Sequence, residues 1–131
     1  MLPRLATTLA VCALVACSGA TPKSTAPPPT SVDAQLAAGA QTFADKCAVC
    51  HGAAGEGGKK APALIGPKAL SDYKAAKDVF AYAKDNMPPD HPGSLGDQDY
   101  WNIVAFLLNK NGTTLSTPLN AANGGSVGTG R

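Results

Sequence analysis

The sequence of 131 residues is poor in charged side chains and has little excess of either sign. Charged residues make up 15% of the chain, with eleven Lys and Arg against nine Asp and Glu, so the formal net charge is only +2. This balance excludes a dedicated nucleic-acid-binding protein, and we expect no nucleic acid among its partners. The length allows one domain and excludes two of ordinary size.

Aromatic residues are also scarce, and they are unevenly placed. The chain has one Trp, three Tyr and three Phe, all of them between Phe43 and Phe106. We therefore expect the packed core to lie in this stretch. A core drawn from about 80 residues rarely supplies more than a few kcal/mol by side-chain packing alone, so a further stabilising group is expected.

Long hydrophobic segments are absent apart from one uncharged run, Leu5 to Val15. A helix needs roughly 18 to 20 apolar residues to cross a bilayer, so this run is too short to span one. Its position and length are typical of a signal peptide, which we predict over residues 1–16. Cleavage after Ala20 and an uncleaved anchor remain as alternatives.

Residues Leu14-Val15-Ala16-Cys17 resemble the bacterial lipobox, whose cysteine is acylated and becomes the new N-terminus. The resemblance implies a lipoprotein with lipidated Cys17, held on a membrane by its acyl chains. Its location would then be the bacterial cell envelope, facing the periplasm or the exterior. The proline-rich residues 17–31 are expected to form an extended linker.

The middle of the chain, residues 32–110, shows helical periodicity and no alternation of period two, which predicts an all-α domain. Apolar spacing, caps and prolines predict three helices: Val32–Cys47, Asp72–Asp85 and Asp97–Lys110. The glycine-rich residues 52–66 are expected to form an ordered loop around some other group. Residues 111–131 contain many glycines and no aromatic residue, so we predict a disordered tail there.

The chain has four cysteines, of which Cys12 falls in the predicted leader and Cys17 at the predicted lipid site. The remaining two, Cys47 and Cys50, are followed directly by His51. This C-x-x-C-H spacing is the one that attaches c-type haem. Two thiols three residues apart at a helix end can form thioethers to the two porphyrin vinyl groups, with the adjacent imidazole under the iron. We predict one covalent haem c on these three residues.

Three other uses of the cysteine pair remain open at this stage. A structural zinc site needs four ligands, and beyond this motif the domain offers only His91 as a further Cys or His. A thioredoxin-like redox pair requires a βαβ setting, which the helical pattern does not provide. A disulfide between Cys47 and Cys50 would leave the glycine-rich loop without a core.

From about Val32 to Lys110 the chain resembles the small class I c-type cytochromes with one haem. Gly39 and Phe43 resemble the glycine and aromatic residue of that family's first helix, which pack across its last helix. The absence of a side chain at Gly39 would let the two helix backbones approach closely. The resemblance implies a small cytochrome c fold, with three main helices around a covalently bound haem.

Further roles follow from the same resemblance. The segment Ala61-Pro62-Ala63-Leu64-Ile65-Gly66 resembles the loop whose proline carbonyl accepts a hydrogen bond from the haem-binding histidine, which assigns that role to Pro62. Asn86-Met87-Pro88-Pro89 resembles the distal segment and implies that Met87 is the second axial ligand. His91 is the rival for that position. Pro92-Gly93-Ser94-Leu95 resembles a segment of cytochrome domains that accompany bacterial dehydrogenases, including those that oxidise sulfur compounds.

The implied ligand pair points to electron transfer. With His51 and Met87 both on the iron, neither O₂ nor a substrate binds without displacing a ligand. We therefore expect a one-electron carrier rather than an enzyme, with redox donor and acceptor proteins as its partners. The alternatives are a haem subunit of a larger dehydrogenase and a haem protein that binds ligands as a peroxidase or sensor.

Overall fold

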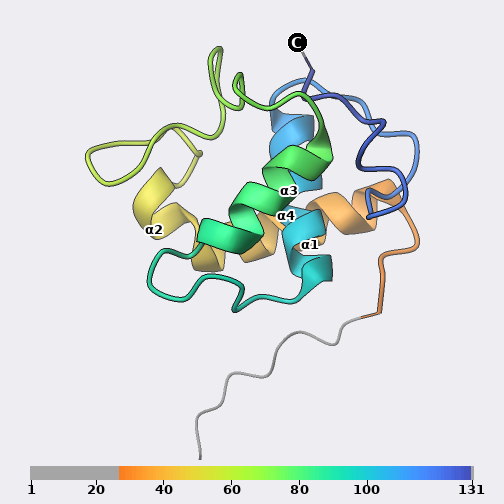
Figure 1. Cartoon of the computed structure of the whole chain (residues 1–131), viewed down its shortest axis with the longest axis horizontal. Helices are drawn as coiled ribbons and strands as arrows, with labels where there is room; N and C mark the ends of the chain where they lie inside the picture. The colour runs from red at the N-terminus through yellow and green to blue at the C-terminus, as the bar shows by residue number, and fades with distance from the viewer. Residues whose placement is uncertain (1–26, 131) are drawn as a thin grey trace, which may run out of the picture.

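The computed structural model describes residues 27–130 and confirms the predicted all-α class. This part of the chain contains four helices, namely α1 (Val32–Lys46), α2 (Ala48–His51), α3 (Ala76–Asn86) and α4 (Asp97–Lys110), and no strand. Helices α1 and α4 cross and pack together, and α3 lies against α4 (Figure 1). None of these helices is long and apolar enough to cross a membrane. The predicted signal peptide, Cys17 and residues 18–26 of the linker lie outside the described residues.

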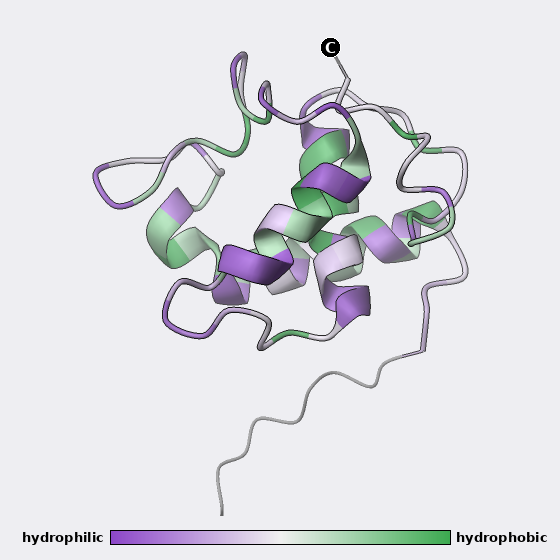
Figure 2. Cartoon of the chain, in the orientation of Figure 1, coloured by the Kyte–Doolittle hydropathy of each residue, from purple (hydrophilic) through white to green (hydrophobic). Residues whose placement is uncertain are grey.

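The helix ends agree with local sequence signals at three of the main boundaries. Ser31 precedes α1, and its hydroxyl accepts a hydrogen bond from the N–H of Ala34 at 3.1 Å. Helix α4 begins and ends where predicted, with Asp97 in its first turn and Lys110 in its last. Both charges are favourable to the helix dipole. In Figure 2, hydrophilic residues gather at the ends of the helices, while apolar residues occur along them.

The predicted start of the second main helix, Asp72, is wrong. Helix α3 begins at Ala76, because Ala75 is in an extended conformation with φ −134° and ψ 160°. Ala75 forms an isolated antiparallel bridge to Gly128, and its N–H donates to the Asp78 carboxylate at 3.0 Å. Pairing with a distant segment therefore removes residues 72–75 from the helix that their spacing had suggested.

The crossing of α1 and α4 depends on Gly39, as the sequence resemblance implied. A Cβ atom at this position would overlap the backbone carbonyl of Asn102 and lie 2.8 Å from the Cβ of Phe106. Four residues further along α1, the ring of Phe43 lies 5.5 Å from the ring of Phe106, centroid to centroid. The helices thus approach through bare backbone at Gly39 and through two aromatic rings beside it.

Residues 111–130 are ordered, which corrects the prediction of a disordered tail over 111–131. Leu119 is only 1% exposed, and both of its backbone groups bind the buried side chain of Gln35. The Leu119 N–H donates to Gln35 Oε1 at 2.6 Å, and Gln35 Nε2 donates to the Leu119 carbonyl at 2.8 Å. The composition predicted disorder because the segment has few large apolar side chains to bury. The segment is instead held largely by backbone hydrogen bonds to distant partners, which composition does not reveal.

The same segment completes the start of α3. The carbonyl of Val127 accepts the Ala76 N–H at 2.8 Å, and the carbonyl of Gly124 accepts the Lys77 N–H at 3.0 Å. The first N–H groups of a helix have no partner within the helix and need one elsewhere. The folded domain therefore extends beyond Lys110, and its C-terminal segment supports the helix that leads to Met87.

We predict that Gly39→Ala strongly destabilises the protein, by about 3 kcal/mol or more, because the added methyl group forces α1 and α4 apart. Denaturant unfolding of the purified protein measures this loss. Gly58→Ala is the matched control, since a Cβ at Gly58 meets no atom within 4 Å. A loss for Gly39→Ala no larger than for Gly58→Ala would show that the helices do not pack as described.

Candidate haem site

The Cys47-x-x-Cys50-His51 motif forms one compact helical turn at the end of α1. Cys47 caps α1, its N–H donating to the carbonyl of Phe43 at 2.8 Å. The Cys47 carbonyl in turn accepts the N–H groups of Cys50 at 3.1 Å and His51 at 3.0 Å. Helix α2 is this turn, which the sequence analysis did not separate from α1. Both cysteines are free thiols and sit close to one helical turn apart, as attachment to two vinyl groups requires.

The imidazole of His51 is buried, at 6% exposed, and its orientation is set by Pro62. His51 Nδ1 lies 2.8 Å from the backbone carbonyl oxygen of Pro62. A carbonyl oxygen only accepts hydrogen bonds, so Nδ1 carries the proton and donates it. The other ring nitrogen, Nε2, is then left with a free lone pair, which is the state that binds a metal. The structure thus brings together the two residues that the sequence resemblance had paired.

The loop between His51 and Gly66 holds the Pro62 carbonyl in place by backbone hydrogen bonds. The Gly57 N–H donates to the His51 carbonyl at 2.7 Å, and the N–H of Leu64 donates to the Gly55 carbonyl at 2.8 Å. Gly57 has φ +76°, and a Cβ there would lie 2.7 Å from the carbonyl carbon of Pro62. A left-handed glycine is therefore required where the loop passes the Pro62 peptide.

Asn111, just after α4, is a supporting residue that the sequence analysis missed. Its amide nitrogen donates to the carbonyl of Leu64 at 2.9 Å, and its amide oxygen accepts the N–H of Gly66 at 3.0 Å. These bonds fasten the far end of the loop to the end of α4. No local pattern could have indicated this role, because Asn111 is distant in sequence from the loop that it binds.

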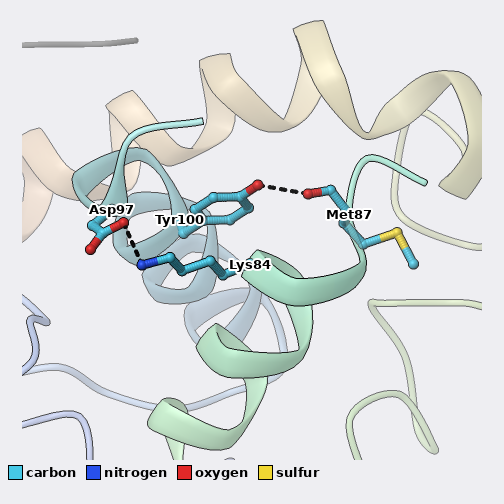
Figure 3. Close-up of polar contacts among 4 residues, drawn as sticks. All are labelled: Lys84, Met87, Asp97 and Tyr100. Carbon is cyan, nitrogen blue, oxygen red and sulfur yellow. Dashed lines mark hydrogen bonds and ion pairs between the residues drawn. The ribbon is translucent and has the colours of Figure 1, made fainter. Parts of the chain in front are cut away.

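Met87 is the first residue after α3 and is partly buried. Its N–H donates to the carbonyl of Ala83 at 2.8 Å, and its carbonyl accepts the hydroxyl of Tyr100 at 2.6 Å. Burial raises the pKa of Tyr100, so its hydroxyl remains a donor at neutral pH. In Figure 3 the Met87 carbonyl points toward Tyr100, whereas the thioether extends away from it. The thioether is thus left free of the contacts that hold the backbone.

His91, the rival ligand, lies at the surface. Its side chain is 74% exposed, and Nδ1 lies 3.3 Å from a carboxylate oxygen of Asp90. Met87 is the candidate whose side chain is partly enclosed by the fold, directly after the end of α3. The local structure therefore favours Met87 over His91 as a ligand within the domain.

The donor set fits a covalently attached haem better than the three alternative uses of the cysteine pair. Within residues 27–130, no group of three or more His, Cys, Asp or Glu side chains is arranged to hold a metal ion by itself. The described chain has no strand from which a βαβ unit could be built, and the two thiols are not joined as a disulfide. The site contains two free thiols beside one buried imidazole whose Nε2 is free to bind a metal. These are the groups that haem attachment uses.

The Cys47 side chain is partly buried in the structure, which affects its chemistry. Burial, with a smaller contribution from nearby Cys50, raises the pKa of Cys47 from 9.0 to about 11. The neutral thiol is therefore the dominant form at pH 7, and the nucleophilic thiolate is rare.

Residues 34–107 match the family model described as cytochrome C oxidase, cbb3-type, subunit III. The match covers more than half of the chain and runs from the first turn of α1 to the last turn of α4. The chain belongs to this cytochrome c family. Membership implies that the group bound by this cytochrome domain is a covalent haem c.

Two relatives of this cytochrome domain carry the name thiosulfate dehydrogenase. One, from Stutzerimonas stutzeri, is 34% identical over 80 residues, which is 55% of this chain and 26% of the relative. The other, from Psychrobacter arcticus, is 35% identical over 92 residues, which is 63% of this chain and 27% of the relative. The matched part of this chain thus spans about a quarter of each relative's length.

A solved structure supports the fold assignment. The sulfane dehydrogenase SoxCD from Paracoccus pantotrophus superposes on this cytochrome domain with a TM-score of 0.62 and 25% sequence identity. The superposition covers 85% of this chain and 68% of the chain in that structure. The likeness confirms the predicted small cytochrome c fold.

We predict that Cys47 of the haem-free protein reacts slowly with iodoacetamide at pH 8 and that its rate rises with pH until about pH 11. Below its pKa, each pH unit increases the thiolate fraction about tenfold, and only the thiolate is nucleophilic. Mass spectrometry of the peptide that contains Cys47 measures the modification site by site. A rate that levels off at pH 9, as for the same protein in denaturant, would contradict the burial of this thiol.

Proposed function

We propose that the protein is a one-electron carrier that holds a single covalent haem c, with His51 and Met87 as its axial ligands. The observation that carries this proposal is the buried His51, whose Nδ1 binds the Pro62 carbonyl beside two free thiols. This arrangement leaves Nε2 available to iron. The chain contains one such motif, which supports one haem.

Each residue of the site has a separate task in this proposal. Cys47 and Cys50 hold the porphyrin by thioether bonds, and the Pro62 carbonyl keeps the His51 ring in one tautomer and orientation. When bound, the haem supplies a reversible one-electron iron couple. Met87 fills the second axial position, and thioether ligation favours a higher reduction potential than a second histidine would. With both positions filled, the site exchanges electrons rather than binding a substrate.

The names of the relatives favour a second candidate function, which is also electron transfer. Two of them are called thiosulfate dehydrogenases, and the matched part of this chain is about a quarter of each. We propose that the redox partners of this chain include a sulfur-compound dehydrogenase, to which it belongs as a haem subunit or from which it accepts electrons. Co-purification with a larger subunit from the native host supports the subunit form, and isolation as a monomer supports the free carrier.

We also propose that acylated Cys17 tethers the domain to a membrane of the bacterial cell envelope, facing the periplasm or the exterior. The support is the lipobox-like segment Leu14-Val15-Ala16-Cys17 and the proline-rich residues after it. Two or three acyl chains hold a protein on a bilayer far more firmly than one. We expect the wild-type protein to be found in the membrane fraction. We expect Cys17→Ser to lack the acyl chains or to keep its signal peptide, and the mass of the purified protein, measured by mass spectrometry, distinguishes these forms.

We predict that the purified reduced protein binds no carbon monoxide at neutral pH, whereas Met87→Ala binds it nearly stoichiometrically. Removal of the thioether opens one axial position on the iron. Visible spectroscopy measures both the carbon monoxide complex and, in the oxidised protein, the weak band near the red edge that reports an iron–sulfur bond to methionine. This band is expected in the wild-type protein and absent from Met87→Ala.

His91→Ala is the matched control and is expected to behave as wild type in both measurements. Carbon monoxide binding by His91→Ala but not by Met87→Ala would assign the second ligand to His91. Rapid binding by the wild-type protein would favour the peroxidase or sensor alternative. A colourless protein with free thiols at Cys47 and Cys50, made in a haem-competent host, would contradict the whole proposal.

A further inference from the structure

We propose that Tyr100 is a positioning residue, which keeps Met87 in place as an iron ligand by binding its backbone carbonyl across the interface of α3 and α4. This inference rests on the ligation by Met87 proposed above and adds the residue that maintains it. Figure 3 shows the contact, with Tyr100 reaching from α4 to the end of α3.

The backbone of Met87 leaves α3 at a point where the local chain offers few hydrogen-bond donors. Met87 is extended, with φ −126° and ψ 143°, so its carbonyl no longer points along the helix. The next two residues, Pro88 and Pro89, have no N–H groups. The hydroxyl of Tyr100, thirteen residues later, provides the partner at 2.6 Å.

The Tyr100 hydroxyl is itself held firmly. Tyr100 is 1% exposed, and its ring packs edge-on against Phe80 of α3, with ring centroids 6.2 Å apart. One buried side chain therefore joins the end of α3 to α4.

A second polar contact, an ion pair, also joins the end of α3 to the start of α4, but it is weaker. Lys84 Nζ lies 2.9 Å from a carboxylate oxygen of Asp97, and both side chains are substantially exposed, at 39% and 58%. Exposed ion pairs contribute little, because water screens the charges and the side chains lose entropy. The buried hydrogen bond from Tyr100 is consequently the stronger of these two polar contacts, and it is the one made directly to the Met87 backbone.

Such anchoring matters because a thioether is a neutral and weak ligand. Its bond to iron competes with water and added ligands, and it survives when the residue is already held near the metal. If the Met87 carbonyl loses its partner, it is left unpaired as long as Met87 stays on the iron. When Met87 moves away from the iron, water can reach this carbonyl and form a hydrogen bond with it. The loss of one hydroxyl therefore favours the state in which Met87 has left the iron.

The test is the affinity of the oxidised holoprotein for imidazole, which displaces Met87 from the iron. Tyr100→Phe keeps the ring against Phe80 and removes only the hydroxyl. We expect imidazole to bind about tenfold more tightly to this variant than to wild type, which corresponds to about 1.4 kcal/mol. Tyr82→Phe makes the same chemical change on the exposed surface of α3, and we expect it to bind imidazole as wild type does.

A double-mutant cycle separates positioning from other effects. In the Met87→Ala background, Tyr100→Phe is expected to leave imidazole affinity unchanged, because no methionine remains to be held. An equal tenfold increase in that background would overturn the inference, since Tyr100 would then control access to the iron instead. Unchanged imidazole affinity in Tyr100→Phe, with a lowered unfolding midpoint, would also overturn it and assign a purely structural role.

The red-edge iron–sulfur band of the wild-type protein distinguishes failure of this inference from failure of the proposed function. If the band is present and Tyr100→Phe binds imidazole as wild type does, Met87 is a ligand that does not depend on Tyr100. If the band is absent from wild-type protein, Met87 is not the ligand, and both the ligation and the inference are wrong.

Discussion

The close crossing of α1 and α4 at Gly39 is the constraint on which the rest of the structure depends. Helix α1 ends at the haem-binding motif, so the position of its axis sets where Cys47 and His51 lie. Helix α4 carries Tyr100 near its start and is followed by Asn111, which fastens the loop that bears Pro62. One helix pair, brought together through bare backbone, thus places the supports of both proposed iron ligands.

The C-terminal segment adds a second layer of support. Its backbone binds Gln35 on α1 and accepts the first N–H groups of α3, so it ties the two outer helices to one another. Gly124 fits closely against the ring of Trp101, where a Cβ would lie within 2.7 Å of the ring. Because α3 leads directly to Met87, ordering of this segment also bears on the position of that proposed ligand.

The two proposed axial ligands are supported in different ways, which suits their chemistry. His51 is held through its ring, by the Pro62 carbonyl at Nδ1, and this bond selects the tautomer that binds iron. Met87 is held through its backbone at both N–H and carbonyl, while its thioether remains unbound by the protein. In the proposed carrier, a histidine and a methionine held in these ways would need to move little when the iron gains or loses an electron.

Local sequence determined the features whose causes are local. The bounds of α4 follow from its charged ends and apolar spacing, and the C-x-x-C-H spacing alone indicated the haem motif, because a helical turn places those groups together. Tertiary structure alone decided the start of α3, the ordering of residues 111–130, and the contacts of Tyr100 and Asn111. In each of these cases a polar backbone group finds a partner far along the chain, and the identity of that partner depends on how the helices pack. Spacing and composition carry no record of such pairings.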